Sequence, residues 1–268
     1  MLNRALLCAI LLAASSDAHA GIHLSADEAA AIGKKIWKNE SGGTIDGLTH
    51  WNKGENFASL GIGHFIWYKA GEPGPFTESF PGLLDALAAS GGKLPVWLQG
   101  KPPCPWSDRD AFFADFRGPR MNELRRLLAG SIGVQARYAA DRLEAALPKI
   151  LAAAPAAKRP ALNVRFDRVA SAPNGVYALM DYVNFKGEGV SPTERYNGEG
   201  WGLLQVLEGM TDAPSGQAAV AAFVKSADAA LTRRMANSPP ARDENRWLAG
   251  WRKRLLTYLD HEAVAPPP

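Results

Sequence analysis

The sequence contains little cysteine and histidine, with two Cys and five His among 268 residues. Cys8 lies in an N-terminal segment that we expect to be removed. This leaves Cys104 alone and excludes an internal disulfide in the mature protein. A structural zinc site is disfavoured as well, because such sites use four Cys or His ligands. We therefore expect no metal and no cofactor, and a fold held together by its hydrophobic core.

The chain also lacks the motifs of several large enzyme classes. It has no GxSxG, HExxH, P-loop or dinucleotide-binding fingerprint, which argues against the common hydrolases, metalloproteases and nucleotide-dependent enzymes. No long Lys/Arg block and no nucleic-acid-binding motif is present, so we expect no nucleic-acid partner. The net charge of +3 and the pI of about 8.8 suit an anionic polymer of the cell envelope.

The longest apolar run lies at the N-terminus and is too short to cross a bilayer. Arg4 precedes the apolar residues 5–14, and residues 18–20 (Ala-His-Ala) form a small-x-small cleavage site. This is the pattern of a secretory signal peptide. We expect residues 1–20 to be cleaved and the mature protein to be periplasmic or secreted, without a stable membrane anchor. An uncleaved N-terminal anchor is the alternative.

Helical patterns dominate the rest of the chain. Ser25 is a good N-cap, and Ala29, Ile32 and Ile36 recur at helical spacing, which predicts an amphipathic helix over residues 26–40. The Ala/Pro-rich residues 152–160 are interpreted as a surface turn rather than a domain boundary. Further helices are expected at 83–89, 108–117, 119–129, 132–153, 175–185, 201–210, 215–236 and 243–259.

The only expected β structure is an irregular hairpin or small sheet within residues 44–67, where turn-forming residues are frequent. The fold class is therefore mainly α with a small β element (α+β). We expect a single domain over residues 21–260, a monomer, and a disordered tail at residues 261–268, because the tail ends in three prolines.

Glu40 is the strongest candidate for a functional residue. It ends the first expected helix, and Ser41, Gly42 and Gly43 stop that helix at once. A carboxylate at this end opposes the helix dipole, so its position favours a function over a solvated helix end. A general acid for glycosidic cleavage needs a carboxyl that is partly buried beside an apolar wall. Trp37, one turn earlier, can supply that wall.

The residues after Glu40 close on a turn that reads Gly61-Ile62-Gly63-His64. Glycines at this point permit positive φ angles or close backbone approach. His64 can orient a carboxylate or a sugar hydroxyl, and an ordinary packed turn is the alternative. Trp51, Trp67, Trp106 and Trp201 lie in loop-like segments, where flat rings can line a sugar cleft. Of these we place Trp67 at the site.

A helix-ending Glu followed by a hairpin that closes on GIGH resembles the phage-type lysozymes and their endolysin relatives. The Glu40-Ser41 pair is also similar to that of the goose-type lysozymes and soluble lytic transglycosylases. The resemblance covers only residues 36–67. It implies a lysozyme-like helical domain with a small sheet, which cleaves the β-1,4 bonds of peptidoglycan with Glu40 as the general acid.

The same resemblance assigns further residues. It implies that Gly61, Gly63 and His64 close the hairpin at the substrate, and that Ser59 replaces a Thr that holds the attacking water. The Asp that phage lysozymes carry after their catalytic Glu is missing, because Thr49 stands in its place. The second catalytic carboxylate therefore stays open between Glu55 and Asp46, and hydrolysis is not separated from transglycosylation.

A second Gly- and acid-rich segment follows the apolar helix expected at 175–185. Asn184, Glu188 and Glu199 are expected to form a substrate wall, and a solvated loop is the alternative. The run GLLQV at residues 202–206 is similar to one in transglycosylases, but it lies too far from Glu40 to be the same motif. Because both candidate segments are rich in acids, the sequence predicts faster cleavage of partly deacetylated, cationic glycan.

The sequence thus predicts an exported glycoside hydrolase of the muramidase type, whose partner is peptidoglycan or a related aminosugar polymer. The first alternative is a chitosanase-like hydrolase, or a lysozyme specific for deacetylated glycan. The second alternative is a non-catalytic glycan-binding protein of the envelope.

Overall fold

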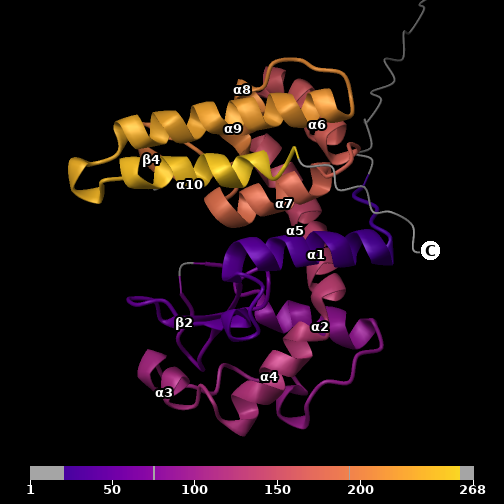
Figure 1. Ribbon diagram of the computed structural model, residues 1–268, viewed down its shortest axis with the longest axis vertical. Coiled ribbons are helices and arrows are strands. Elements are labelled where there is room, and N and C mark those ends of the chain that lie inside the picture. The colour runs from indigo at the N-terminus through magenta and orange to yellow at the C-terminus, as the bar shows by residue number, and fades with distance from the viewer. Residues whose placement is uncertain (1–20, 75, 193, 260–268) are drawn as a thin grey trace, which may run out of the picture.

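The structure is a computed structural model that describes residues 21–74, 76–192 and 194–259 (Figure 1). The expected signal peptide, residues 1–20, and the expected tail, residues 261–268, lie outside the described residues. The described chain is mainly helical with two small antiparallel sheets, so the expected α+β class is confirmed. None of the described helices is long and apolar enough to cross a membrane.

The expected helices agree with the observed ones to within a few residues at each end. The structure adds α6 and the hairpin β4–β5, which the sequence did not predict. The helices are α1 (Ala26–Ser41), α2 (Phe80–Ala89), α3 (Arg109–Ala114), α4 (Pro119–Ala129), α5 (Ile132–Ala152), α6 (Arg159–Ala170), α7 (Gly175–Lys186), α8 (Leu203–Gly209), α9 (Gln217–Asn237) and α10 (Asn245–Leu256). Short 3-10 helices are η1 (Asp46–Leu48), η2 (Val96–Leu98), η3 (Ala156–Lys158) and η4 (Pro240–Arg242). The strands are β1 (Thr49–His50), β2 (Phe57–Leu60), β3 (Phe65–Tyr68), β4 (Arg195–Tyr196) and β5 (Glu199–Gly200).

Helix α1 begins and ends through local capping. The Glu28 amide donates to Ser25 Oγ, and the Ser25 amide donates to Glu28 Oε2, which completes a capping box. Gly42 follows the helix with φ 62°, in the left-handed region, and its amide donates to the Lys38 carbonyl. This stop places Glu40 in the last turn of α1.

The larger sheet has the order β1-β2-β3 and is antiparallel throughout. Thr49 pairs with Leu60, and Ser59 pairs with Ile66. The turn between β2 and β3 rests on α5, because the Ile62 amide donates to Gln135 Oε1 at 3.0 Å. The GIGH segment is therefore a turn docked on a helix, and its last residue is His64.

Helix α1 lies between two parts of the molecule (Figure 1). The larger sheet and α2–α4 lie on one side, α6–α10 lie on the other, and α5 runs between them. The buried apolar residues of both parts belong to one hydrophobic cluster. Glu40, near the C-terminal end of α1, is thus placed where the sheet faces the C-terminal helices.

Helix α5 continues past Pro148 to Ala152, in agreement with the helix expected at residues 132–153. Helix α6 follows the segment that was interpreted as a turn, and Leu162, Phe166 and Val169 form its buried face. These three positions have helical spacing, so the sequence contained the signal for α6.

Candidate functional site

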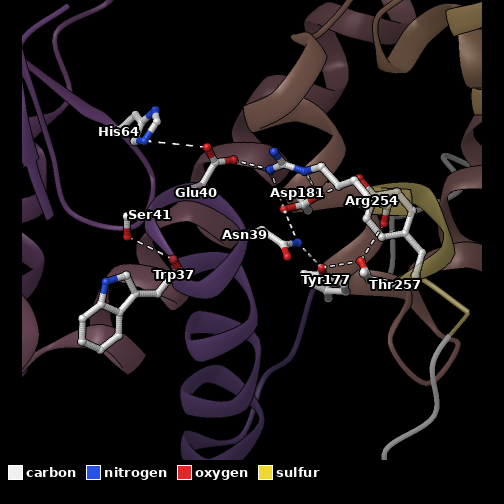
Figure 2. A network of polar contacts seen from close by, with 10 residues as sticks. Trp37, Asn39, Glu40, Ser41, His64, Tyr177, Asp181, Arg254 and Thr257 are labelled. Atoms are coloured by element: carbon white, nitrogen blue, oxygen red, sulfur yellow. Dashed lines mark hydrogen bonds and ion pairs between the residues drawn. The ribbon is translucent and has the colours of Figure 1, made fainter. Parts of the chain in front are cut away.

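Glu40 is the centre of the candidate site, and its carboxyl contacts side chains from both parts of the molecule (Figure 2). Arg254, from α10, donates a hydrogen bond from Nη2 to Glu40 Oε1. His64, from the turn between β2 and β3, places Nε2 at 3.7 Å from Glu40 Oε2. The Glu40 side chain is 13% exposed, so the carboxyl is partly buried and still reachable from outside.

His64 is placed by its backbone rather than by side-chain contacts. Its φ angle is 47°, in the left-handed region that His adopts more readily than most residues. Gly61, at the start of the turn, has φ 67°, and an added Cβ there would lie 2.2 Å from Gln135 Oε1. The turn therefore needs glycine at position 61, and it leaves the His64 side chain 47% exposed beside Glu40.

Arg254 is held much more firmly than His64. Its Nε and Nη2 donate to the two carboxylate oxygens of Asp181, at 2.7 and 2.8 Å. The guanidinium also lies 4.4 Å from the centre of the Phe185 ring. Burial opposes the charge of Arg254, but hydrogen bonds and attraction from Asp181 and Glu40 raise its pKa above the ordinary value. Arg254 is thus a fixed cation beside Glu40.

Asp181 lies in α7 with no exposed surface. Its carboxylate accepts the two bonds from Arg254 and a third from the Tyr258 hydroxyl, at 2.7 Å. Asn39 donates to the Tyr177 hydroxyl at 2.6 Å and lies 3.5 Å from Asp181. The network therefore joins α1, α7 and α10 around one buried carboxylate (Figure 2).

Asp46, one of the two expected second acids, is engaged elsewhere. Arg117 and Arg125 lie 2.9 and 3.3 Å from its carboxylate oxygens. Arg125 is 2% exposed, and it also donates to Thr49 Oγ1 at 2.8 Å. Burial lowers the pKa of Arg125 and the charge of Asp46 opposes that shift. Asp46 thus compensates a buried cation in the scaffold.

Glu55, the other expected acid, has a different environment. Asn52 Nδ2 donates to Glu55 Oε2 at 3.0 Å, within the turn that precedes β2. Among the described residues, Glu55 forms no ion pair, and neither Glu55 nor Asp46 hydrogen-bonds to Glu40. No group of His, Cys, Asp and Glu within the described residues is able to hold a metal ion.

The hairpin glycines face the protein interior. The α-carbon of Gly61 faces Gln135, and an added Cβ at Gly63 would lie 2.7 Å from the Phe65 ring. Ser59 is 7% exposed within β2. Close packing explains why positions 61 and 63 are glycines, and the expected substrate contacts of Gly61 and Gly63 stay predictions. The role of Ser59 toward a water stays a prediction.

Trp67 does not line an open cleft, so this expectation was wrong. Its side chain is 0% exposed, and its indole donates to the Pro102 carbonyl at 3.0 Å. Trp51, Trp106 and Trp201 are also buried. Large rings contribute most when they leave water completely, and a main-chain carbonyl satisfies the polar end of Trp67. These rings form the core instead.

The second acid-rich segment is tied to its own surroundings. Asn184 is exposed in the last turn of α7. Glu188 Oε2 lies 3.4 Å from Lys149 Nζ, and Glu199 Oε2 lies 3.2 Å from Arg233 Nε. Among the described residues, none of these three expected wall residues hydrogen-bonds or ion-pairs with Glu40. Both acids have cationic partners at the surface, and the expected preference for a cationic substrate stays a prediction.

The GLLQV run also has a structural explanation. Gln205 accepts a hydrogen bond from the Gly202 amide and donates one to the Gly189 carbonyl, each at 3.0 Å. Gly189 has φ 83°, and an added Cβ there would lie 2.3 Å from Gln205 Oε1. Gln205 thus fastens the segment between α7 and α8.

Sequence reasoning missed Arg254 and Asp181. A signal for Asp181 was present, because it is the only charged residue within the apolar run GVYALMDYVNF, and a buried carboxylate needs a partner. Arg254 has no such signal, since it is one of several basic residues in α10.

No protein-family model, no curated protein and no solved structure matches this chain.

Proposed function

We propose that the protein is a lysozyme-like glycoside hydrolase of peptidoglycan, with Glu40 as the general acid. The observation that carries this proposal is the Glu40 carboxyl itself. It stands at the end of a capped helix, 13% exposed, between a half-exposed His64 and the partly buried cation of Arg254. The helix-ending Glu40 and the GIGH turn beside it fit what the resemblance to phage-type lysozymes implies.

The two carboxyl oxygens of Glu40 have different surroundings, which suits proton donation. Oε1 accepts from Arg254, whereas Oε2 faces His64 on the more exposed side. In the proposed reaction, Glu40 gives its proton to the glycosidic oxygen while the bond from that oxygen to the anomeric carbon breaks. Arg254 then stabilises the carboxylate that remains, because a charge-assisted hydrogen bond is stronger than a neutral one.

The attacking group needs a base, and Glu55 suits this role better than Asp46. Two arginines compensate the charge of Asp46, whereas among the described residues the Glu55 carboxylate has only the side-chain amide of Asn52 as a partner. Inverting glycosidases keep their carboxyls about 6.5–9.5 Å apart, so that a water fits between them. In this arrangement, water adds to the anomeric carbon and Glu55 takes its proton.

The charges near Glu40 favour a neutral, N-acetylated substrate over a cationic one. Arg254 is a permanent cation at the carboxyl, and His64 becomes a second one when it is protonated. Free glucosamine amines are positively charged and are repelled by such groups. The chitosanase-like alternative therefore has less support than a muramidase. The non-catalytic alternative is left to the experiment.

Glu40→Gln tests the proposal directly. We expect turnover of purified peptidoglycan to fall by roughly 10²–10⁴-fold, which is the usual contribution of general acid catalysis. Glu199→Gln is the matched control, because it makes the same change at an exposed ion pair with Arg233. Its turnover should match that of the unmodified protein on both acetylated and deacetylated polymer.

The products and Glu55→Gln complete this experiment. Ordinary reducing ends identify water as the attacking group, and anhydro-muramyl ends identify the sugar's own hydroxyl. In the first case, Glu55→Gln should be nearly as inactive as Glu40→Gln. Full activity in a folded Glu40→Gln protein would contradict the proposal. Binding of peptidoglycan without any turnover by the unmodified protein would support the glycan-binding alternative instead.

A further inference from the structure

Asp181 is a fully buried carboxylate that the proposed reaction does not use. It lies in α7, where the neighbouring residues Met180 and Tyr182 are also buried. A carboxylate in such surroundings is costly unless it is paired and hydrogen-bonded. Arg254 and Tyr258 supply three short hydrogen bonds to it, at 2.7–2.8 Å. Asp181 therefore has its partners, and one of them is also a partner of Glu40.

The guanidinium of Arg254 is shared between two carboxylates. Nη2 donates both to Asp181 Oδ1 and to Glu40 Oε1 (Figure 2). The second bond to Asp181, from Nε, fixes the plane of the guanidinium. Two parallel bonds to one carboxylate are the most directional contact that arginine makes. The direction from which Arg254 meets Glu40 is thus set by Asp181.

Sharing the cation also changes its electrostatic effect on Glu40. A lone arginine beside a carboxyl favours the ionised form, and an ionised Glu40 has no proton to donate. The negative charge of Asp181, on the same guanidinium, offsets part of that field. A general acid must keep its proton near the working pH. Glu40 therefore keeps its proton more easily when Arg254 is shared with Asp181 than it would if Arg254 paired with Glu40 alone.

We propose that Asp181 is a positioning residue for Glu40, which orients Arg254 and limits the effect of its charge so that Glu40 retains a proton for catalysis. The proposal rests on the proposed function of Glu40. Asp181 itself is buried and touches no substrate. It acts only through the guanidinium that it holds.

Other charged or titratable groups around Glu40 leave this role to Asp181. Burial raises the pKa of Tyr177 to about 12, and it raises the pKa of Tyr258 well above the ordinary value, so neither hydroxyl ionises near neutral pH. Asp46, near the end of α1, is compensated by two arginines. Among the described residues, the charged or titratable groups beside Glu40 or its immediate partners are His64 from the hairpin, Arg254 and Tyr258 from the C-terminal region, and Asp181, Tyr177 and Lys186 from α7, the last of which lies over the same Phe185 ring as Arg254.

Asp181→Asn removes the charge and keeps the size. The asparagine oxygen keeps one of the two hydrogen bonds from Arg254, whereas the NH2 group that replaces the other oxygen meets the second Arg254 N–H and cannot accept from it. The full charge of Arg254 then acts on Glu40. We expect the alkaline limb of the pH profile of kcat/KM, measured on peptidoglycan, to move to lower pH by about one unit. A purely structural role for Asp181 does not move that limb.

Tyr258→Phe is the matched control, because it removes a hydrogen bond to Asp181 and leaves the charge in place. It should lower the melting temperature without moving the limb. The same shift in both variants, or an unmoved limb in a folded Asp181→Asn protein, would overturn the proposal. The proposed function fails separately, through an active Glu40→Gln protein or an inactive unmodified one.

A double variant covers the case in which Asp181→Asn does not fold. Asp181→Asn with Arg254→Gln leaves neither charge buried, so folding is not penalised by an unpaired ion. Arg254 is the nearer of the two charges to Glu40, since it alone contacts it. The alkaline limb of the double variant should therefore lie at higher pH than that of the unmodified protein. A limb at lower pH than that of the unmodified protein would show that Arg254 is not the dominant charge at Glu40 and would overturn the proposal.

Discussion

The two sides of Glu40 are built in different ways. On the hairpin side, His64 is 47% exposed, and a single 3.7 Å contact joins it to the carboxyl. On the helical side, Arg254 is 15% exposed and donates two hydrogen bonds to the buried Asp181, which hold it in place. On the hairpin side, water or a ligand is thus able to replace the contact between His64 and Glu40, whereas the helical side is part of the scaffold.

This difference separates two tasks that one carboxyl must combine. A proton donor needs an oxygen that a substrate reaches, and it also needs a fixed orientation. Glu40 Oε2 faces the exposed histidine, and Oε1 is anchored to the partly buried guanidinium of Arg254. Changes on the helical side should therefore affect stability most, and changes on the hairpin side should affect activity with little effect on stability.

Arg254→Met should have the largest effect on stability. It leaves the Asp181 carboxylate buried without a cation, and breaking a buried pair in this way costs about 3–5 kcal/mol. Urea unfolding at neutral pH measures the loss. Arg252→Met is the control, because Arg252 lies in the same helix and pairs with Asp228 at the surface. The control should unfold as the unmodified protein does. Equal losses in the two variants would contradict the contrast between the buried and the exposed pair.

Lys186 should produce a smaller effect that depends on pH. It lies on the helical side with 9% of its surface exposed, and its ammonium is 3.7 Å from the centre of the Trp251 ring. Burial, with a further contribution from Arg234, lowers the pKa of Lys186 to about 7. In the unfolded chain a lysine keeps its proton to about pH 10.4. Stability should therefore rise between about pH 7 and 10, where only the unfolded chain binds this proton.

Lys186→Met isolates this contribution, because methionine keeps an unbranched apolar side chain and cannot be protonated. Within this pH window, the free energy of unfolding should increase more steeply with pH in the unmodified protein than in the variant, by up to about 1.4 kcal/mol per pH unit. Urea unfolding of both proteins at pH 7, 8 and 9 measures the difference. A difference that is constant over these three pH values would show that Lys186 does not lose its proton on folding.

His64→Asn should have the smallest effect on stability and a modest one on activity. Asparagine also tolerates the positive φ of 47° at this position, so the change tests the side chain alone. Unfolding free energy should stay within about 0.5 kcal/mol, as for most surface substitutions. We expect kcat/KM on peptidoglycan to fall by up to about tenfold, which is the effect of losing one contact of about 1.4 kcal/mol. A large loss of stability would show that His64 stabilises the fold, as Arg254 is expected to do.

The sequence alone determined the features that depend on neighbouring residues. Ser25 and Gly42 set the ends of α1, and the position of Glu40 in the last turn follows from them. Gly61 indicated the turn that delivers His64. Caps and turns involve residues only a few positions apart, so their chemistry is readable along the chain. The α+β class follows from the same local patterns.

Only the tertiary structure decided what surrounds Glu40. Arg254 lies 214 positions along the chain from it, and no local pattern distinguishes Arg254 from the other basic residues of α10. The pairing of Asp46 with Arg125 and the burial of Trp67 likewise depend on elements that meet only in the folded chain. Acid-rich segments therefore suggested an anionic cleft, although packing brought a cationic partner to each of Asp46, Glu188 and Glu199. The sequence shows which residues are charged, and the tertiary structure determines which of them form pairs. The reason is that a buried ion is stable only where packing places an opposite charge beside it.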